Sequence, residues 1–498
     1  MKPVHLIPAA VVLLALAAIG VVAQVDHPAA SVNPAVTAIR QVAVTSAARA
    51  CPPALGGGSG TIASIAAPAG SAGSAGPGQA ELTSMPLAGV PLRPVSPISE
   101  KSPGVLSLLT VPAAASAAKK GTPAPTGWSV QASGTMAQAI ETEVAQSSGL
   151  ASVRCGEPGS DLWFVGPGQQ NGASQIQLDL MNIDSLPATV DVSMITDAGP
   201  VQSGADTGIT VPPYQTVTES LSSAAANSSV VAIHVHTSSG RVAADVSAGP
   251  AHGGTTTWLP SAAAPSTQLV IPGVPPSSSA AGLFLVVPGS ANAKVNVLAI
   301  TPQGQYRPFG SQPTELPGES ASYTALTPLG GTPAALEVTA NVPVLAAVLV
   351  PGSGVGAVTA ATGPISEQAV VAGNTSGSGF SALVVLSAPA GAARVRLTEI
   401  AEASSTGASS TGAGPSGSQV TTVRAGHTLV VPVKAPPGAK RGSAFAIVIT
   451  PLAGSGPLYA ARVETQGQST VVSIIPAASA LTTIALPPVR DSYDAISP

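Results

Sequence analysis

Two histidines on one predicted strand are the nearest this sequence comes to a metal site. In residues 231–236 aliphatic side chains alternate with His234 and His236, so on a β-strand both imidazoles point to one face. A two-residue Ser-Gly turn follows, and it predicts that Asp245 on the next strand lies opposite His234. Two imidazoles and a carboxylate suit a divalent transition metal, so His234, His236 and Asp245 are a candidate ligand trio. We favour the alternative, a solvated face with one cross-strand His–Asp pair, because the later repeats have no histidine there.

Three aromatic residues suggest a second chemistry, the stacking of sugar rings. Trp163, Phe164 and Trp258 could form a flat platform for carbohydrate. The interpretation we prefer is that they cover the core or the edge of a sandwich. Glu157 and Asp161 are the carboxylates near Trp163, but they are too close in sequence to flank a cleft as the two acids of a glycosidase do.

Signatures of catalysis and of cofactor binding are absent from the sequence. There is no Gly-x-Ser-x-Gly elbow, phosphate loop, His-Glu-x-x-His or dinucleotide fingerprint. A Ser–His–Asp triad would have to be assembled across distant segments from only six histidines. We therefore expect no catalytic residues and no cofactor.

The N-terminal segment predicts export. Residues 6–23 contain no charged side chain, and Val21 and Ala23 suit the −3 and −1 positions of a signal-peptidase site before Gln24. The segment also reaches the lower length limit of a membrane-spanning helix. Residues 1–25 are therefore a signal peptide or an N-terminal anchor, and in the second case the membrane is a partner.

Export determines how the two cysteines are interpreted. Cys51 and Cys155 are 104 residues apart, and an even pair outside the cytoplasm predicts a disulfide. Closing so long a loop contributes at most about 4–5 kcal/mol. Two cysteines cannot make a structural zinc site, and neither has a histidine nearby that would activate a catalytic thiol.

Residues 26–157 are rich in Gly, Ser, Ala and Pro, which predicts a flexible region with a few short strands. Within it, Met136, Ile140 and Val144 recur every four residues and predict a short helix over 135–148. Glu141 and Glu143 would then be exposed charges on different faces of that helix.

After this region the chain repeats itself three times. Each repeat opens on an apolar strand with a glycine, at Gly166, Gly273 and Gly373, and each has an alternating strand about 20 residues later. Units of about 100 residues with period-two alternation predict antiparallel sandwiches, for which an immunoglobulin-like topology is the best guess. We expect module one at 158–262, module two at 265–362, module three at 366–478 and a C-terminal tail at 479–498.

Composition agrees with an all-β chain and excludes one class of partner. Charged residues are 8% of the chain and aromatics 3%, while there are 53 glycines and 49 prolines. Small aliphatic side chains must therefore form the core, and many turns must interrupt it. The net charge of −4 and the lack of a basic stripe exclude nucleic acid as a partner.

Several short motifs stand out along the chain: the Cys51-Pro52 pair, Arg-Cys-Gly-Glu-Pro at 154–158, residues 161–166, Leu-Asp-Leu-Met-Asn at 178–182, and His-Thr-Ser-Ser-Gly-Arg-Val at 236–242. Together they resemble a family of uncharacterised secreted actinobacterial proteins, classed as domain of unknown function 5719. The resemblance implies secretion or membrane attachment, an all-β fold and the two cysteines as a pair. It implies no activity.

These observations predict a non-catalytic, extracytoplasmic structural or binding protein of the cell envelope. Its partner would be the cell wall or another envelope protein. The alternative is a carbohydrate-binding protein or an accessory enzyme of envelope polysaccharide metabolism.

Overall fold

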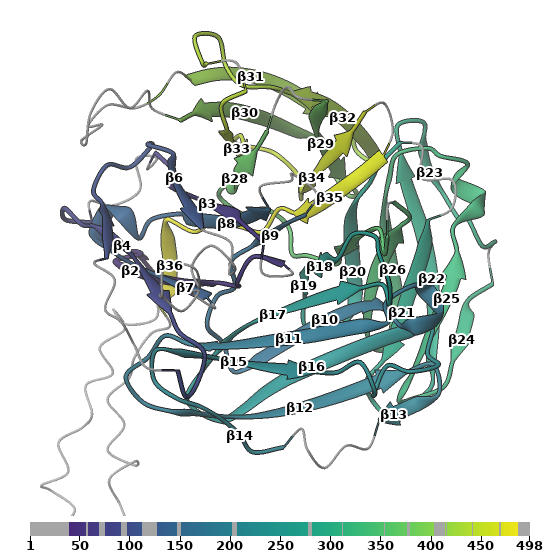
Figure 1. Ribbon diagram of the computed structural model, residues 1–498. Coiled ribbons are helices and arrows are strands. Elements are labelled where there is room, and N and C mark those ends of the chain that lie inside the picture. Colours follow the sequence, from purple (N-terminus) through teal and green to yellow (C-terminus); the bar gives the residue numbers. More distant parts are fainter. Residues whose placement is uncertain are drawn as a thin grey trace, which may run out of the picture. The chain divides into compact units, whose positions relative to one another are not determined.

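The computed structural model is built almost entirely of antiparallel β-strands, which confirms the all-β prediction (Figure 1). It describes residues 39–55, 58–68, 75–90, 97–111, 127–146, 151–201, 207–276, 281–310, 312–352, 354–375, 379–402, 414, 416–440, 442–467 and 470–486. Within these ranges no helix is long and apolar enough to cross a membrane. The predicted signal peptide or anchor, residues 1–25, lies outside them.

Module one consists of two facing sheets. The first contains β10 (Asp161–Pro167), β12 (Ala188–Thr196), β13 (Gly199–Val201), β14 (Ile209–Val211), β16 (Val230–Ser239) and β19 (Ser261–Ala262). The second contains β11 (Gln175–Asn182), β15 (Gln215–Ser220), β17 (Ala243–Gly249) and β18 (Thr257–Leu259). Alternate residues of both sheets, such as Val190, Val235 and Val246, are buried in one core. The period-two pattern therefore sets which face of each strand is buried.

Module two is unusual in that one strand belongs to both sheets. Its strands are β20 (Ser266–Val274), β21 (Gly282–Val287), β22 (Ala293–Thr301), β23 (Gly304–Tyr306), β24 (Thr314–Leu316), β25 (Ser320–Ala325), β26 (Ala334–Val350) and β27 (Ala357–Ala360). The first half of β26 pairs with β20 and β22, and its second half pairs with β21 and β27. The change of sheet falls near Pro343, which has no backbone N–H to donate to a ladder.

Module three has two four-stranded sheets, ordered β28-β33-β30-β31 and β32-β29-β34-β35. The strands are β28 (Ala369–Asn374), β29 (Phe380–Ala388), β30 (Ala393–Ala401), β31 (Ser416–Val423), β32 (His427–Val433), β33 (Phe445–Pro451), β34 (Tyr459–Gln466) and β35 (Thr470–Pro476). The repeated landmarks of the sequence lie on equivalent strands, because β10, β20 and β28 open the modules and β12, β22 and β30 carry the alternating segments.

The described part of residues 26–157 forms a fourth pair of sheets instead of a flexible region. We call residues 46–154 the N-terminal sandwich. Its sheets are ordered β2-β7-β4-β5 and β6-β3-β8-β9. The strands are β2 (Ser46–Cys51), β3 (Gly60–Ala66), β4 (Ala80–Met85), β5 (Ile98–Glu100), β6 (Ser107–Val111), β7 (Gly127–Ser133), β8 (Ile140–Gln146) and β9 (Ser152–Arg154). Small side chains such as Ala66 and Ala80 pack in its core beside Ile62 and Leu82.

The short helix predicted over 135–148 is wrong. A 3-10 turn at Gly134–Met136 is followed by strand β8, which pairs with β3. A four-residue spacing is also an even spacing, so Ile140 and Val144 share one face of a strand as readily as one face of a helix. Glu141 and Glu143 are buried on the other face, not exposed.

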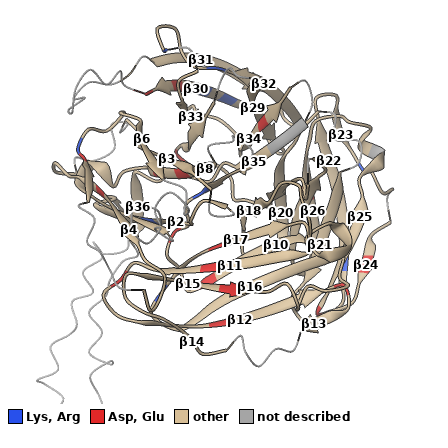
Figure 2. Cartoon of the chain, in the orientation of Figure 1, with Lys and Arg blue, Asp and Glu red and all other residues tan. Residues whose placement is uncertain are grey.

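The four sandwiches contact one another in a closed cycle. The N-terminal sandwich contacts module one through β2 and β9, and module three through β8 and β9. Module two contacts module one through β26 and β27, and module three through β20 and β27. Charged side chains are sparse along the strands (Figure 2). Separately, β1 (Arg40–Ala43) and β36 (Thr483–Leu486) form a two-stranded sheet.

Candidate functional site

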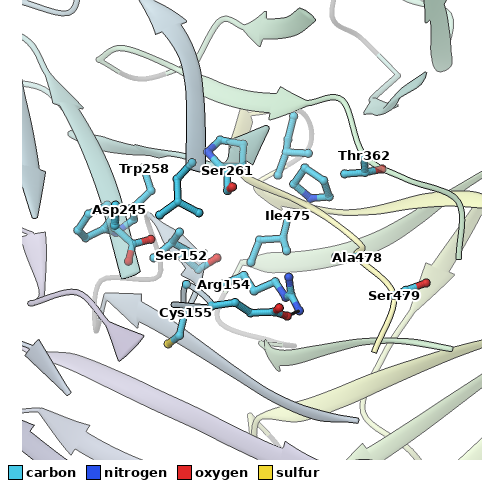
Figure 3. Close-up of a pocket in the computed structure, with 18 residues that line it drawn as sticks. Ser152, Arg154, Cys155, Asp245, Trp258, Ser261, Thr362, Ile475, Ala478 and Ser479 are labelled. Atoms are coloured by element: carbon cyan, nitrogen blue, oxygen red, sulfur yellow. Dashed lines mark hydrogen bonds and ion pairs between the residues drawn. The ribbon is translucent and has the colours of Figure 1, made fainter. Parts of the chain in front are cut away.

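A pocket of about 400 Å³ lies where all four sandwiches meet, and we call it the central pocket. Its size falls within the range of small-molecule sites. Figure 3 shows Asp245 and Trp258 on one side of it and Thr362 and Ser479 on the other. The residues that line it are Ser152, Val153, Arg154, Cys155, Gly156, Glu157, Leu162, Ala244, Asp245, Trp258, Pro260, Ser261, Thr362, Ile474, Ile475, Pro476, Ala478 and Ser479.

Asp245 is a buried acid, and no cation among the described residues compensates it. It lies on β17 directly opposite Asp179 of β11, and both side chains are inaccessible to solvent or nearly so. Burial, followed by repulsion from Asp179, raises the pKa of Asp245 well above its usual range. Burial likewise raises the pKa of Asp179 to about 6, against hydrogen bonds from Thr218 and Gln177. Asp245 therefore presents a neutral carboxylic acid to the pocket at mildly acidic pH.

Two polar atoms of the pocket lack hydrogen-bond partners. Among the described residues, neither Oδ2 of Asp245 nor Oγ1 of Thr362 has one. Buried polar atoms are normally paired with protein or water, because an unpaired group keeps its desolvation cost of about 1–3 kcal/mol. Both atoms are buried, and both belong to residues that line the pocket.

Arg154 and Glu157 form the charged part of the wall. Nε of Arg154 lies 2.6 Å from Oε1 of Glu141, and its Nη2 lies 3.3 Å from Oε1 of Glu157. Arg49 also contacts Glu157, at 2.9 Å. Burial raises the pKa of Glu157, but Arg49 and Arg154 outweigh it and hold that pKa below its usual value. Two guanidiniums thus face two carboxylates, and their charges cancel.

The disulfide of Cys51 with Cys155 holds this wall in place. The two sulfurs are bonded, and Cys155 itself lines the pocket directly after β9. Cys51 ends β2, so the bond joins the two sheets of the N-terminal sandwich. This is the pair predicted from the sequence.

A second buried ion pair, which the sequence did not reveal, joins the N-terminal sandwich to module three. Nη2 of Arg462 lies 2.5 Å from Oε1 of Glu143 and donates to the hydroxyl of Ser152 at 2.7 Å. Its Nη1 lies 2.8 Å from Oε2 of Glu464. Burial raises the pKa of Glu143 to about 7, and Arg462 acts against that rise. A lone Arg between Ala and Val on a strand gave no sign that its side chain is fully buried.

The trio of His234, His236 and Asp245 is not assembled. The turn after β16 leads to β17 in the opposite sheet, so Asp245 pairs with Asp179 and not with His234. On the face that carries the histidines, Asp161 of β10 supplies the carboxylate instead, and Nε2 of His234 lies 3.1 Å from its Oδ1. Burial lowers the pKa of His234, and Asp161 acts in the opposite direction.

The three aromatic residues do not form a platform, and they cover the core as the preferred interpretation expected. Phe164 is buried in the core of module one, and Trp258 lies at the central pocket. Trp163 stacks on His234, with ring centroids 3.9 Å apart and 4° between the ring planes. Glu157 and Asp161 do not belong to one site. Glu157 lines the central pocket, whereas Asp161 contacts His234.

Comparison with known proteins places the chain in a family. No curated protein matches it. The model of a family of unknown function, DUF5719, matches residues 111–434, which span the end of the N-terminal sandwich, modules one and two and most of module three. The chain belongs to this family of unknown function.

Proposed function

We propose that this chain is a non-catalytic, extracytoplasmic binding protein of the cell envelope, and that the central pocket holds its ligand. The observation that carries the proposal is the pair of unpartnered buried atoms, Oδ2 of Asp245 and Oγ1 of Thr362, in one pocket of ligand size. They come from different modules, so a single small molecule would connect module one with module two.

The chemistry of the wall favours an uncharged, hydroxyl-rich ligand such as a saccharide unit. A protonated Asp245 donates a hydrogen bond and Thr362 can donate or accept one. The charges of Arg49, Arg154, Glu141 and Glu157 cancel, so the wall attracts neither anions nor cations. Trp258 also lines the pocket, but its ring is packed in a hydrophobic core, so it contributes an apolar patch of wall and no stacking platform.

Two features support a location outside the cytoplasm. The disulfide between Cys51 and Cys155 persists in oxidising compartments, whereas cytosolic thiols are kept reduced. The charge-free segment at residues 6–23 is typical of an export signal or an anchor. N-terminal sequencing of the mature protein after cell fractionation tests this part. Recovery of the chain in the cytosol with both thiols reduced would contradict it.

An accessory enzyme of envelope polysaccharide metabolism is the second candidate, and the pKa values of two pocket acids favour it. Asp245 has a raised pKa and Glu157 a lowered one, which is the pattern of a general acid with a carboxylate partner. The first candidate is preferred because two guanidiniums already occupy the carboxylate of Glu157, which makes it a weak base.

Calorimetric titration of the full chain with neutral oligosaccharides tests the proposal. The probes are oligomers of N-acetylglucosamine, mannose and glucose, together with soluble fragments of purified cell wall. We expect Asp245→Leu and Thr362→Val each to weaken binding roughly threefold to tenfold, because each removes one hydrogen bond. Glu315→Gln, on an exposed surface pair with Lys294, is the matched control and leaves binding unchanged.

Asp245→Asn separates the two candidates. The amide keeps a donor in the same place but cannot supply a proton, so a binding protein retains its affinity in this variant. An enzyme would release shortened saccharides in the wild type and lose that activity in the variant. Saccharide binding without turnover supports the first candidate, and no binding of any probe by the wild type contradicts the saccharide proposal.

A further inference from the structure

Three side chains that can bind a metal meet on the outer face of module one, away from the central pocket. Asp161 of β10 is the register partner of His236 on β16, and His234 lies two residues earlier on the same face. One ligand atom from each of the three lies within 4.8 Å of the other two. Backbone pairing of β10 with β16 continues from Asp161 to Pro167, so the sheet itself fixes the spacing of these residues.

The distances suit a small tetrahedral ion. Metal–ligand bonds of about 2.0–2.1 Å place neighbouring ligand atoms about 3.3 Å apart in a tetrahedral zinc site. Nε2 of His234 and Oδ1 of Asp161 are 3.1 Å apart, close to that edge. His236 and Asp161 are exposed, so a small change of side-chain rotamer brings the third donor to the same distance.

One of the three ligands is already held in position. The ring of His234 lies flat on Trp163, with centroids 3.9 Å apart and the planes 4° from parallel. The stack restricts rotation of the imidazole and aims its Nε2 at Asp161. Ordering a ligand before the metal arrives reduces the entropy that binding costs.

The charge around His236 favours a dication. Asp161 and Asp191 are its register partners on the two neighbouring strands, β10 and β12. A simple ion pair with Asp161 would need only one histidine, and His234 already forms it. The imidazole of His236 is not needed for that ion pair, but it would be needed as a further ligand of a bound cation.

From this geometry we propose that Asp161, His234 and His236 bind one Zn²⁺ or a similar divalent transition metal ion. Two imidazoles and one carboxylate leave the fourth position of a tetrahedral ion open to water or an exogenous ligand. His234 and Trp163 also line a groove of about 620 Å³, whose other wall includes Pro288 and Pro343 of module two. The groove provides room for such a ligand beside the open position.

Zinc titration of the untagged full chain, after dialysis against a chelator, tests the site. We expect one ion per chain, and we expect His236→Gln and Asp161→Asn each to weaken binding at least about tenfold. His252→Gln is the matched control, because His252 is an exposed histidine outside the cluster, and it leaves affinity unchanged. The thermal unfolding midpoint of each metal-free variant is compared with that of the metal-free wild type. Equal midpoints show that a variant loses zinc affinity without losing its fold.

Cobalt gives a second readout that a non-specific surface contact would not produce. We expect Co²⁺ added to the wild type to show the strong visible absorption of a tetrahedral complex, and we expect His236→Gln to abolish it. The proposal is overturned if zinc does not bind, or if neither His236→Gln nor Asp161→Asn changes the affinity. Because none of these residues lines the central pocket, saccharide binding in the variants separates this proposal from the proposed function.

Discussion

Arg462 and Glu143 form a fully buried ion pair between module three and the N-terminal sandwich, with Nη2 and Oε1 2.5 Å apart. The two residues are 319 positions apart in sequence, so the contact forms only when β34 and β8 come together. The same guanidinium reaches Glu464 and Ser152, and the backbone N–H of Gly373 donates to Oε2 of Glu143. The pair therefore fixes the junction beside the central pocket.

Arg462→Met is expected to destabilise the protein by about 3–5 kcal/mol at neutral pH. The substitution leaves Glu143 and Glu464 buried without a cation, and an uncompensated buried charge is costly. The penalty decreases as the pH falls, because a protonated Glu143 no longer needs the guanidinium. Denaturant unfolding at neutral and at acidic pH measures both effects. Arg394→Met on β30, where the side chain is exposed, is the control and should change stability little. Equal losses in the two variants would contradict a special role for Arg462.

The pair of Asp179 and Asp245 makes the protein less stable as the pH rises. Both acids have pKa values above their ordinary ones in the folded state, so the native state holds more protons than the unfolded state. The stability that protonation contributes is fully present below about pH 4 and is lost as the pH rises through the folded pKa, which for Asp179 is about 6.

Asp245→Asn should remove much of this loss, because the amide mimics the neutral acid at every pH. We expect the variant to gain on the order of 1–3 kcal/mol over the wild type at about pH 7, and to match it at about pH 4. Thermal or denaturant unfolding across this range checks the difference. Other acids whose pKa is raised, such as Glu143, contribute equally to both proteins and cancel. A variant less stable than the wild type at neutral pH would contradict this account.

Reduction of the Cys51–Cys155 bond is expected to lower stability by up to about 4–5 kcal/mol, because it closes a loop of 104 residues. Comparing unfolding with and without dithiothreitol, and in a Cys51→Ala/Cys155→Ala variant, measures the loss. The double variant controls for effects of the reductant. Since Cys155 lines the central pocket, we also expect weaker saccharide binding in the reduced protein.

Trp258 belongs to module one but packs in the core of the N-terminal sandwich. Its replacement by Ala is expected to cost about 3–5 kcal/mol, because it leaves a cavity where the two sandwiches meet. Trp163→Ala removes a ring of the same size that is only partly buried, and should cost less. Unfolding midpoints of the two variants give the comparison, and a larger loss for Trp163→Ala would contradict this packing.

Local alternation made much of modules one to three predictable. Strands such as β12, β22 and β30 each bury their alanine and their valines or leucine on one face, and that pattern is visible in the residues themselves. Two errors arose where distant contacts decide the outcome. The spacing of Ile140 and Val144 fits both a helix and a strand, and only pairing with β3 selects the strand. The turn between β16 and β17 crosses from one sheet to the other, and no local signal distinguishes that turn from a hairpin.

The central pocket could not be predicted from the sequence. Its walls come from stretches that are far apart in the sequence, with residues such as Glu157, Asp245, Thr362 and Ser479, and these stretches meet only through the cycle of contacts among the sandwiches. Asp245 lies in a strand with alternating apolar residues, and that pattern predicts that an acidic side chain between them faces solvent. The composition of residues 26–157 did not indicate a folded domain. Many of its core residues are alanines, which differ little in hydrophobicity from the Gly and Ser around them, so the strands show no clear alternation of apolar and polar residues.

The most direct test of the account is the infrared difference spectrum of the wild type minus Asp245→Asn at about pH 5, with and without the tightest-binding saccharide. We predict the C=O band of a protonated carboxyl in the wild type that the variant lacks, and a shift of that band when the saccharide binds. If the difference spectrum contains only carboxylate bands, or if the band does not respond to a bound saccharide, then Asp245 is not the neutral hydrogen-bond donor of the central pocket.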